Sequence, residues 1–593
     1  MKPAVQRVRG TKLRVRRRAA RLAVAVALLA AAVLAAEARA AARAPATGTN
    51  GMVASPQPDA TRAGVEMLRA GGNAIDAAVA TAFALSVTDP FHSGIGGGGF
   101  LLIRLADGRV IAIDARETAP FASNRRMFLR PGLPENASRV GALAVATPGL
   151  LAGLAEAQRE FGTRTLADVL APAIRLAEEG FGIGPHHARM LVAWRAFGAE
   201  RFPETARIQL PAGDAPIEPG WRLVQTDLAA SLRTIAREGP DVFYRGSLAR
   251  AITEDVKRRG GILSLRDLEA YRAKRREPIR GSYRDYEVFS FPPSSSGGVA
   301  LLEILNVVET FDLRERGAGS SASIHVIAEA MKFAFADRAT YLGDADFVDV
   351  PVAGLTSKTY AADLRARINP AFWSRAPWNW FQSEIVVNVP EPTVPPIEDS
   401  GTSHLSVADA AGNAVAITQT INTLFGSGIT VPGTGVVLNN QMDDFSVALN
   451  TPNVYQLVDT RGANAIAPGK RPLSSMTPTI VVRDEKPFMV TGSPGGPRII
   501  STTLLTILNV VDYGMNVQEA VSAPRFHHQW RPPRLYLERA IPQDVIRGLR
   551  GRGHDVETSN RDWSNAQSIV IDPETGRFEG GSDPRGDGLA LGY

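Results

Sequence analysis

Hydrophobic positions in the first part of the chain repeat with the spacing of helices and then of strands. Residues 59–71 (DATRAGVEMLRAG) begin with a capping aspartate and end with a glycine, which predicts a helix. Residues 73–87 (NAIDAAVATAFALSV) are largely apolar, which predicts a second, buried helix. The apolar runs FLLIRL and RVIAIDA follow, joined by the turn residues Ala106, Asp107 and Gly108, and predict a β-hairpin.

Helical patterns dominate the middle of the chain, and strand patterns follow residue 402. Residues 323–341 predict a long helix with apolar residues spaced for one face. Three earlier segments are also helical: LLAGLAEAQREF, LADVLAPAIRLAEEG and TDLAASLRTIAREG. Strand-like segments after residue 402 are TSHLSVAD, NAVAITQT, GVVLNN, PTIVVRD and PFMVTG, and the helical ISTTLLTILNVVDYG and VQEAVSAP follow them. Because short turns join most strands and helices flank them, we predict an α+β fold with layered antiparallel sheets rather than a doubly wound parallel sheet.

The composition excludes several kinds of chemistry. Hydrophobic residues make up 45% and charged residues 21% of the 593 residues, as in globular proteins, which leaves one very large core or two to three domains open. The absence of cysteine rules out disulfides, thiol catalysis and thiolate-bound metals. The eight histidines form no HExxH motif, and we expect no metal site.

The positive charge of the chain belongs to its N-terminal leader. Residues 1–40 contain ten Lys or Arg and one Glu, so the net charge of +6 becomes −3 without them, and we expect no nucleic-acid partner. These residues have the layout of a signal peptide: a basic start, an apolar run at 22–36 and an A-x-A pattern at 38–40. The alternative is a membrane anchor, but a spanning helix needs about 20 apolar residues. We therefore expect a periplasmic or secreted protein.

Two glycine-rich stretches resemble known motifs without fulfilling them. Residues 94–99 (GIGGGG) match G-x-G-x-x-G, but a helix precedes them and a strand follows, the reverse of a dinucleotide site. We expect instead a place where the backbone packs closely or takes a positive φ. Residues 492–496 (GSPGG) are not a nucleophile elbow. They form either a tight turn or a pair of backbone N–H donors for an oxyanion.

Two threonines are expected to face each other across a hairpin. TSHLSVA and AVAITQT flank the five-residue connection DAAGN, which is typical of a hairpin turn. In the simplest register Thr402 lies opposite Thr420, with Cβ atoms roughly 5 Å apart. A two-residue slip would place Thr418 or Asn422 there instead, and a Thr–Thr pair is also an ordinary feature of sheets.

The bond between Gly401 and Thr402 is a candidate cleavage site. A threonine hydroxyl is a poor nucleophile without a base. If the bond is cut, Thr402 gains an α-amine with a pKa of about 7.7–8.0, close enough to accept the proton of its own hydroxyl. Gly401 lets the backbone bend so that this hydroxyl can attack the Gly401 carbonyl. A cut at this bond would therefore make Thr402 a nucleophile with its own base.

Several motifs in one order resemble the γ-glutamyltranspeptidases, a family of N-terminal-nucleophile hydrolases. The similarity runs from about residue 50 to the C-terminus. One departure is Ser403, where a threonine is common; its hydroxyl is kept, so a difference would concern the rate of maturation. The motifs are SGIGGGGF (93–100), DARETAP (114–120), GTSH (401–404), LNNQMDDFS (438–446), KRPLSSMTPT (470–479), TGSPGGPRII (491–500) and DYGMNVQEAVSAPRFHHQW (512–530).

This resemblance implies a four-layer αββα sandwich of two stacked, mainly antiparallel sheets. A precursor would cut itself into a large subunit, residues 41–401, and a small subunit, residues 402–593, which remain together as a heterodimer. The enzyme would transfer the γ-glutamyl group of glutathione or related γ-glutamyl compounds to water or to amino acid or peptide acceptors, without a cofactor.

The resemblance also implies residue roles in catalysis. Thr402 would carry the γ-glutamyl group as an ester, and Thr420 would form a hydrogen bond with Thr402. Gly495 and Gly496 would supply the oxyanion hole.

The implied substrate-binding residues have the charges that a buried zwitterion needs at its two ends. Arg116 would bind the glutamyl α-carboxylate, and Asp444 would bind the α-ammonium. Tyr455 would lie on a lid that limits water and bulky substrates, which favours glutathione-sized substrates over poly-γ-glutamate. The remaining contacts would be Ser474 and Ser475 to the carboxylate, with Asn422 and Gln441 near the ammonium.

Two alternatives remain at this point. A relative with the same machinery could take another acyl group, as a glutaryl-type β-lactam side-chain acylase does. Arg116, Asp444 and the paired serines favour an α-amino acid instead. An exported binding protein without catalysis could also keep the pocket, but the intact Thr402 and Thr420 favour an enzyme.

Overall fold

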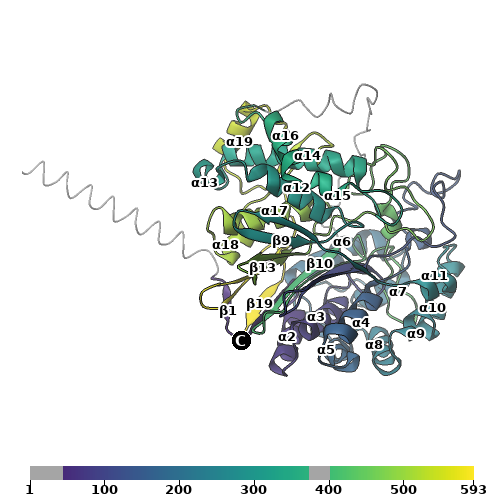
Figure 1. The fold of residues 1–593 in the computed structure, drawn as a ribbon. Coiled ribbons are helices and arrows are strands. Elements are labelled where there is room, and N and C mark those ends of the chain that lie inside the picture. The colour runs from purple at the N-terminus through teal and green to yellow at the C-terminus, as the bar shows by residue number, and fades with distance from the viewer. Residues whose placement is uncertain (1–43, 373–400, 562) are drawn as a thin grey trace, which may run out of the picture. The chain divides into compact units, whose positions relative to one another are not determined.

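Two seven-stranded sheets lie face to face in the computed structural model, which describes residues 44–372, 401–561 and 563–593 (Figure 1). Neighbouring strands are antiparallel throughout both sheets. The first sheet has the order β1 (Ala46–Gly48), β18 (Phe578–Ser582), β17 (Gln567–Ile571), β13 (Lys486–Gly492), β12 (Thr479–Arg483), β9 (Tyr286–Ser290) and β8 (Ile279–Tyr283). The second has the order β19 (Leu589–Gly592), β2 (Gly51–Ser55), β10 (Thr402–Asp409), β11 (Ala414–Thr420), β3 (Gly98–Arg104), β4 (Val110–Ala115) and β7 (Lys274–Arg276).

Helices cover the outer face of each sheet, which gives four layers within the compact unit 45–593 (Figure 1). On the side of the second sheet lie α2 (Pro58–Arg69), α3 (Ala74–Thr88), α4 (Leu150–Phe161), α5 (Leu166–Glu179), α6 (Pro185–Gly198), α7 (Pro203–Gln209), α8 (Thr226–Glu238), α9 (Asp241–Tyr244), α10 (Ser247–Arg258) and α11 (Leu265–Ala270). On the side of the first sheet lie α12 (Gly297–Val308), α13 (Leu313–Arg316), α14 (Ser321–Tyr341), α15 (Val352–Leu355), α16 (Lys358–Arg367), α17 (Arg498–Val511), α18 (Val517–Ser522) and α19 (Gln543–Gly551). The short elements are η1 (Ala142–Ala144), η2 (Gln441–Asp444), the pair β5 (Phe181–Gly182) and β6 (Arg222–Leu223), and the small sheet β14 (Phe526–His527), β15 (Leu535–Leu537) and β16 (Val556–Thr558).

Three apolar cores hold these layers together. One core lies between the two sheets and includes Phe100, Phe291 and Ile480. The other two lie between each sheet and its own helices. The predicted αββα sandwich is therefore confirmed.

Most of the predicted elements are present, and α3 shows why the prediction succeeds. All of its residues are buried, and Asn73 caps its N-terminus by accepting hydrogen bonds from the backbone N–H groups of Ile75 and Asp76. A helix without a polar face can be stable only inside the protein, as its sequence indicated.

Two expectations about local structure are wrong. The helix predicted at 323–341 exists, but it does not have one buried and one exposed face: α14 is buried on all sides from Ser323 to Thr340. Its polar residues pair internally, as Lys332 does with Glu329 at 2.7 Å. GVVLNN (435–440) is not a strand; Val437 forms only an isolated bridge with Thr430.

The predicted leader, residues 1–40, lies outside the described residues. Within the described ranges, no helix is long and apolar enough to cross a membrane.

Candidate active site

The hairpin formed by β10 and β11 has the predicted register. Thr402 pairs with Thr420 at its open end, and Ala408 pairs with Ala414 next to the turn. The hairpin is fixed in the middle of the second sheet, because β10 also pairs with β2 and β11 with β3. The two threonine hydroxyls lie 3.1 Å apart.

The Gly-rich motif before β3 allows the backbone to approach this hairpin closely. A Cβ atom on Gly97 would lie 2.0 Å from the carbonyl oxygen of Thr420, and one on Gly96 would lie 2.1 Å from that of Val437. The motif therefore serves close packing, as expected from its order in the sequence.

Three groups converge on the hydroxyl of Thr420. It donates a hydrogen bond to the carbonyl oxygen of Gly401, and it accepts one from the backbone N–H of Asn422 at 2.8 Å. Since its single proton goes to Gly401, its remaining lone pair is available to accept the proton of the Thr402 hydroxyl. The nucleophile and the carbonyl of the bond before it are thus linked through one side chain.

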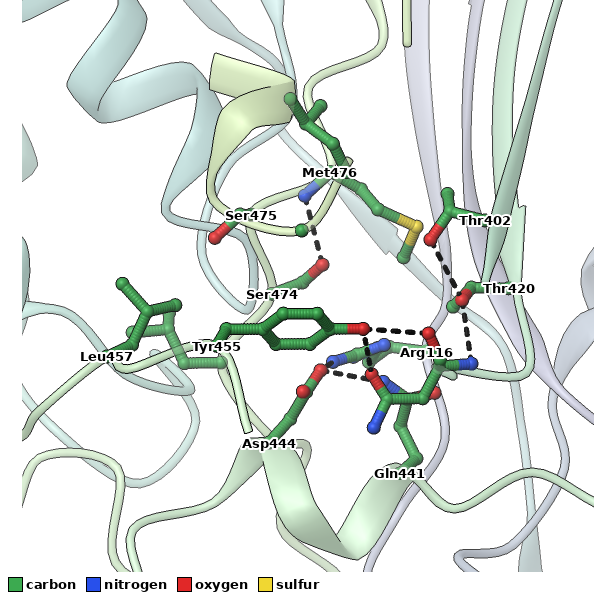
Figure 2. Close-up of a pocket in the computed structure, with 14 residues that line it drawn as sticks. Arg116, Thr402, Thr420, Gln441, Asp444, Tyr455, Leu457, Ser474, Ser475 and Met476 are labelled. Carbon is green, nitrogen blue, oxygen red and sulfur yellow. Dashed lines mark hydrogen bonds and ion pairs between the residues drawn. The ribbon is translucent and has the colours of Figure 1, made fainter. Parts of the chain in front are cut away.

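One pocket brings nearly all predicted site residues together (Figure 2). Gly495 is the exception among the predicted catalytic and binding residues, and it directly precedes Gly496 in the pocket wall. The apolar residues of the wall had no sequence signal that separated them from core residues. The lining consists of Arg116, Thr402, Thr420, Asn422, Gln441, Asp444, Tyr455, Leu457, Leu473, Ser474, Ser475, Met476, Gly496 and Ile499.

The two predicted charges of the pocket contact each other. Arg116 forms a buried ion pair with Asp444, and Gln441 donates to the same Asp444 oxygen at 2.6 Å. The other Asp444 oxygen, Oδ1, has no hydrogen-bond partner among the described residues. These contacts hold both charges in place, with one carboxylate oxygen still able to accept a donor.

Sequence reasoning missed the buried carboxyl group of Glu117. It lies 3.5 Å from the guanidinium of Arg116. Burial raises the pKa of Glu117 to about 7, against the opposing effect of Arg116. Its place directly after Arg116 in the DARETAP motif was the available signal.

Asp114, near the end of β4, connects the segment that carries Arg116 to the loop that carries the serines. Its carboxylate accepts a hydrogen bond from the backbone N–H of Arg116 at 3.0 Å and pairs with Arg471 at 3.2 Å. On the serine side, the Ser296 hydroxyl donates to the Ser474 carbonyl at 2.6 Å. These buried contacts hold Arg116 and Ser474 in the wall of one pocket.

Tyr455 closes the pocket from the side of the loop after η2. Its hydroxyl donates to the backbone oxygen of Asn422 at 2.7 Å and lies 2.9 Å from its Oδ1 (Figure 2). The ring leaves no room for a side chain at Gly496, where a Cβ would lie 2.7 Å from it. Gly495 and Gly496 have φ values of 135° and 56°, which favour glycine.

Ser403 points away from the pocket, into the layer of helices. Its hydroxyl donates to Asp89 at 2.6 Å and lies 2.9 Å from the hydroxyl of Ser93. The serine at this position therefore anchors β10 to the segment after α3.

Among the described residues, His325, Glu329 and His554 form the one cluster whose geometry could hold a metal ion. These groups already have partners inside the protein. The rings of His325 and His554 lie 2.7 Å apart between Nδ1 and Nε2, and Lys332 pairs with Glu329. The cluster lies outside the pocket that contains Thr402.

Comparisons with known proteins agree with this geometry. The crystal structure of a cephalosporin acylase from Bacillus halodurans matches with a TM-score of 0.80 and 32% identity, covering 93% of this chain and 97% of that one. Together with the layered fold, this places the chain in the class of N-terminal-nucleophile hydrolases.

The sequence comparisons define the family. The model of the gamma-glutamyltranspeptidase family matches residues 60–593. The glutathione hydrolase proenzyme of Escherichia coli (strain K12) is 45% identical over 93% of both chains. The acylase ACY 1 proenzyme of Pseudomonas sp. (strain V22) is 43% identical over 92% of this chain and 94% of its own. The chain belongs to the γ-glutamyltranspeptidase family and is an enzyme of that family.

Proposed function

We propose that the chain is an exported precursor that cuts itself before Thr402 and then acts as a glutathione hydrolase and γ-glutamyltransferase. The observation that carries this proposal is the convergence of Thr402, Thr420 and the Gly401 carbonyl at the edge of a pocket with one buried cation and one buried anion. Export rests on the leader sequence at residues 1–40.

Self-cleavage would begin with attack of the Thr402 hydroxyl oxygen on the Gly401 carbonyl carbon. The Thr420 hydroxyl, which donates to that carbonyl oxygen, would stabilise the negative charge that develops there. The peptide C–N bond then breaks, its nitrogen takes a proton, and an ester joins Gly401 to the Thr402 oxygen. Water hydrolyses this ester, which leaves a carboxylate on Gly401 and a free α-amine on Thr402.

The resulting pieces, residues 41–401 and 402–593, would remain associated. The second sheet alternates between them, because β10 and β11 lie between β2 and β3. The strand pairing and the apolar cores that join them are buried, so separation would expose both.

In the mature enzyme Thr402 would attack the γ-carbonyl of a γ-glutamyl amide. Its own α-amine accepts the hydroxyl proton and passes it to the leaving amine, and the γ-glutamyl group remains as an ester on Thr402. Water then releases glutamate, or the amine of an amino acid or peptide forms a new amide. Gly495 and Gly496 would provide backbone N–H donors to the oxyanion.

The glutamyl group would bind by replacing the ion pair between Arg116 and Asp444. Its α-carboxylate would take the guanidinium of Arg116 together with Ser474 and Ser475. Its α-ammonium would bind Asp444, whose free oxygen Oδ1 can accept it, with Asn422 and Gln441 beside it. Tyr455 would cover the bound group.

Intact mass spectrometry of purified protein tests the proposal. The wild type should give two chains separated before Thr402, and Thr402→Ala should give one unprocessed chain without activity toward γ-glutamyl-p-nitroanilide. A Thr402→Ala protein that still splits and still releases p-nitroaniline would contradict the mechanism. The mass of the larger piece also reports whether the leader is removed.

A second candidate is hydrolysis of a different acyl amide, because some of the similar proteins are named acylases. A glutaryl group lacks the ammonium that Asp444 would bind. Competition between γ-glutamyl and glutaryl substrates separates the two, and preference for the glutaryl compound would support the acylase.

A further inference from the structure

The HHQW segment of the last sequence motif lies against the lid, a role that the catalytic proposal does not give it. The lid is defined here as residues 450–459, which contain Tyr455. Its base is closed by the backbone N–H of Asn450, which donates to the Asp459 carbonyl at 2.9 Å. Inside the lid, the Gln456 N–H donates to the Asn453 carbonyl at 2.9 Å. The lid contains no helix or strand, so its position over the pocket depends on contacts with the rest of the protein.

The side chain of Gln529 supplies such a contact. Its side-chain nitrogen Nε2 lies 3.1 Å from the Tyr455 carbonyl oxygen and 3.4 Å from that of Gln456. The side chain is buried, with 7% of the residue exposed. It therefore donates to the backbone of the residue whose ring closes the pocket.

A buried histidine orients this amide. His527 Nε2 lies 3.0 Å from Gln529 Oε1, and His527 Nδ1 lies 3.0 Å from the hydroxyl of Ser501 on α17. Burial lowers the pKa of His527 to about 3, so its ring is neutral and carries one proton. With that proton on Nε2, the ring donates to Oε1 and the amide nitrogen faces the lid.

We infer that Gln529 is a positioning residue that holds the Tyr455 lid closed over the glutamyl pocket. Of the contacts between the lid and the rest of the protein, two are made by Tyr455. The Tyr455 hydroxyl binds Asn422 at the pocket, and the Tyr455 carbonyl binds Gln529 in the segment that follows β14. Through Gln529 the position of the ring depends on a buried chain of contacts that ends on α17.

The inference rests on the proposed function only for its kinetic test. Gln529→Met keeps the length of the side chain and removes its donors. Gln518→Met is a matched control, because Gln518 is also buried and donates to a backbone carbonyl, that of Ser582 at 3.0 Å. Loss of a neutral hydrogen bond predicts a KM for γ-glutamyl-p-nitroanilide raised on the order of tenfold in Gln529→Met, with a smaller change in kcat. Gln518→Met should leave KM unchanged.

A double-mutant cycle with Tyr455→Ala tests whether Gln529 acts through the lid. If it does, Gln529→Met adds little to the KM of Tyr455→Ala, since the ring that it positions is already gone. Additive effects of the two changes would overturn the inference, as would equal KM changes in Gln529→Met and Gln518→Met.

Limited proteolysis gives a readout that needs no enzymatic activity. Chymotrypsin should cut after Tyr455 or Leu457 faster in Gln529→Met than in the wild type or Gln518→Met, measured as fragments by intact mass. Equal cleavage rates in all three proteins would overturn the inference that Gln529 holds the lid, even for a chain without γ-glutamyl activity. Faster cleavage of Gln529→Met in a chain without γ-glutamyl activity would support the role of Gln529 and contradict the proposed substrate.

Discussion

Replacing Thr420 by valine would remove one hydroxyl from the active-site hairpin and leave the volume of the side chain nearly unchanged. That hydroxyl donates to the Gly401 carbonyl and lies 3.1 Å from the hydroxyl of Thr402. If self-cleavage proceeds through attack of Thr402 on Gly401, the substitution removes a donor from the developing oxyanion and a partner from the nucleophile. The register of the hairpin should survive, since its other strand pairs remain.

The size of the effect follows from the lost donor. Removal of one oxyanion donor costs about 3 to 4 kcal/mol of transition-state stabilisation, so cleavage should slow by roughly 10²–10³-fold. The backbone N–H of Asn422 also loses its acceptor, which should lower the free energy of unfolding by about 1–3 kcal/mol. Thr420→Ser keeps the hydroxyl and should process at a rate close to that of the wild type.

The assay follows intact mass against time after purification of the freshly expressed precursor. Thr418→Val is a matched control on the same strand, because Thr418 is buried and its hydroxyl lies 2.8 Å from His404 Nδ1, outside the pocket. Cleavage of Thr420→Val within about tenfold of the Thr418→Val rate would refute the role of the hydroxyl. So would a Thr420→Ser protein as slow as Thr420→Val.

Three further predictions concern the pocket and its support. Asp444→Asn should raise KM for γ-glutamyl-p-nitroanilide by roughly 10²-fold, because the substrate ammonium loses its counter-charge. Processing before Thr402 should continue. An unchanged KM would contradict the assignment of Asp444 to the ammonium. Burial raises the pKa of Glu117 from its usual 4.5 to about 7. Between pH 4.5 and 7 the Glu117 carboxyl is therefore mostly protonated in the folded protein but ionised in the unfolded chain. Stability should therefore fall by about 3 kcal/mol as pH rises from 4.5 to 7, and Glu117→Gln should remove this part of the pH dependence in denaturant titrations. Gly97→Ala should prevent folding or processing, whereas Gly94→Ala, with open space around it, should process normally on a denaturing gel.

The parts of the fold that the sequence predicted are those with a strong local signal. The register of Thr402 opposite Thr420 follows from strand length and a short connection, both of which are local. The short strands β8 and β9 carry no clear strand pattern, because each mixes a charged residue with apolar ones, and β17 is only five residues long. GVVLNN has the composition of a strand, but tertiary contacts around Gly435, where φ is 67°, override it.

The site could be predicted only in part, for the same physical reason. The family motifs identified the pocket residues one by one, and nearly all of them line one pocket. No motif indicates that Arg116 contacts Asp444, because the two residues lie far apart in the sequence and meet only in the folded protein. The contact of Gln529 with the Tyr455 carbonyl was equally hidden, since it joins a side chain to the backbone of a loop.

The direct pairing of Arg116 with Asp444 also bears on which acyl group the pocket favours. A ligand with only a carboxylate would have to replace Asp444 as the partner of Arg116. The Asp444 carboxylate would then be buried beside the negative charge of the ligand. An α-amino acid would bring an ammonium to Asp444 and a carboxylate to Arg116, so it would exchange one buried ion pair for two. Breaking a buried pair without replacement costs about 3–5 kcal/mol, which corresponds to more than a hundredfold in affinity. We therefore expect the γ-glutamyl group to be preferred over glutaryl, because it would leave neither charge without a partner.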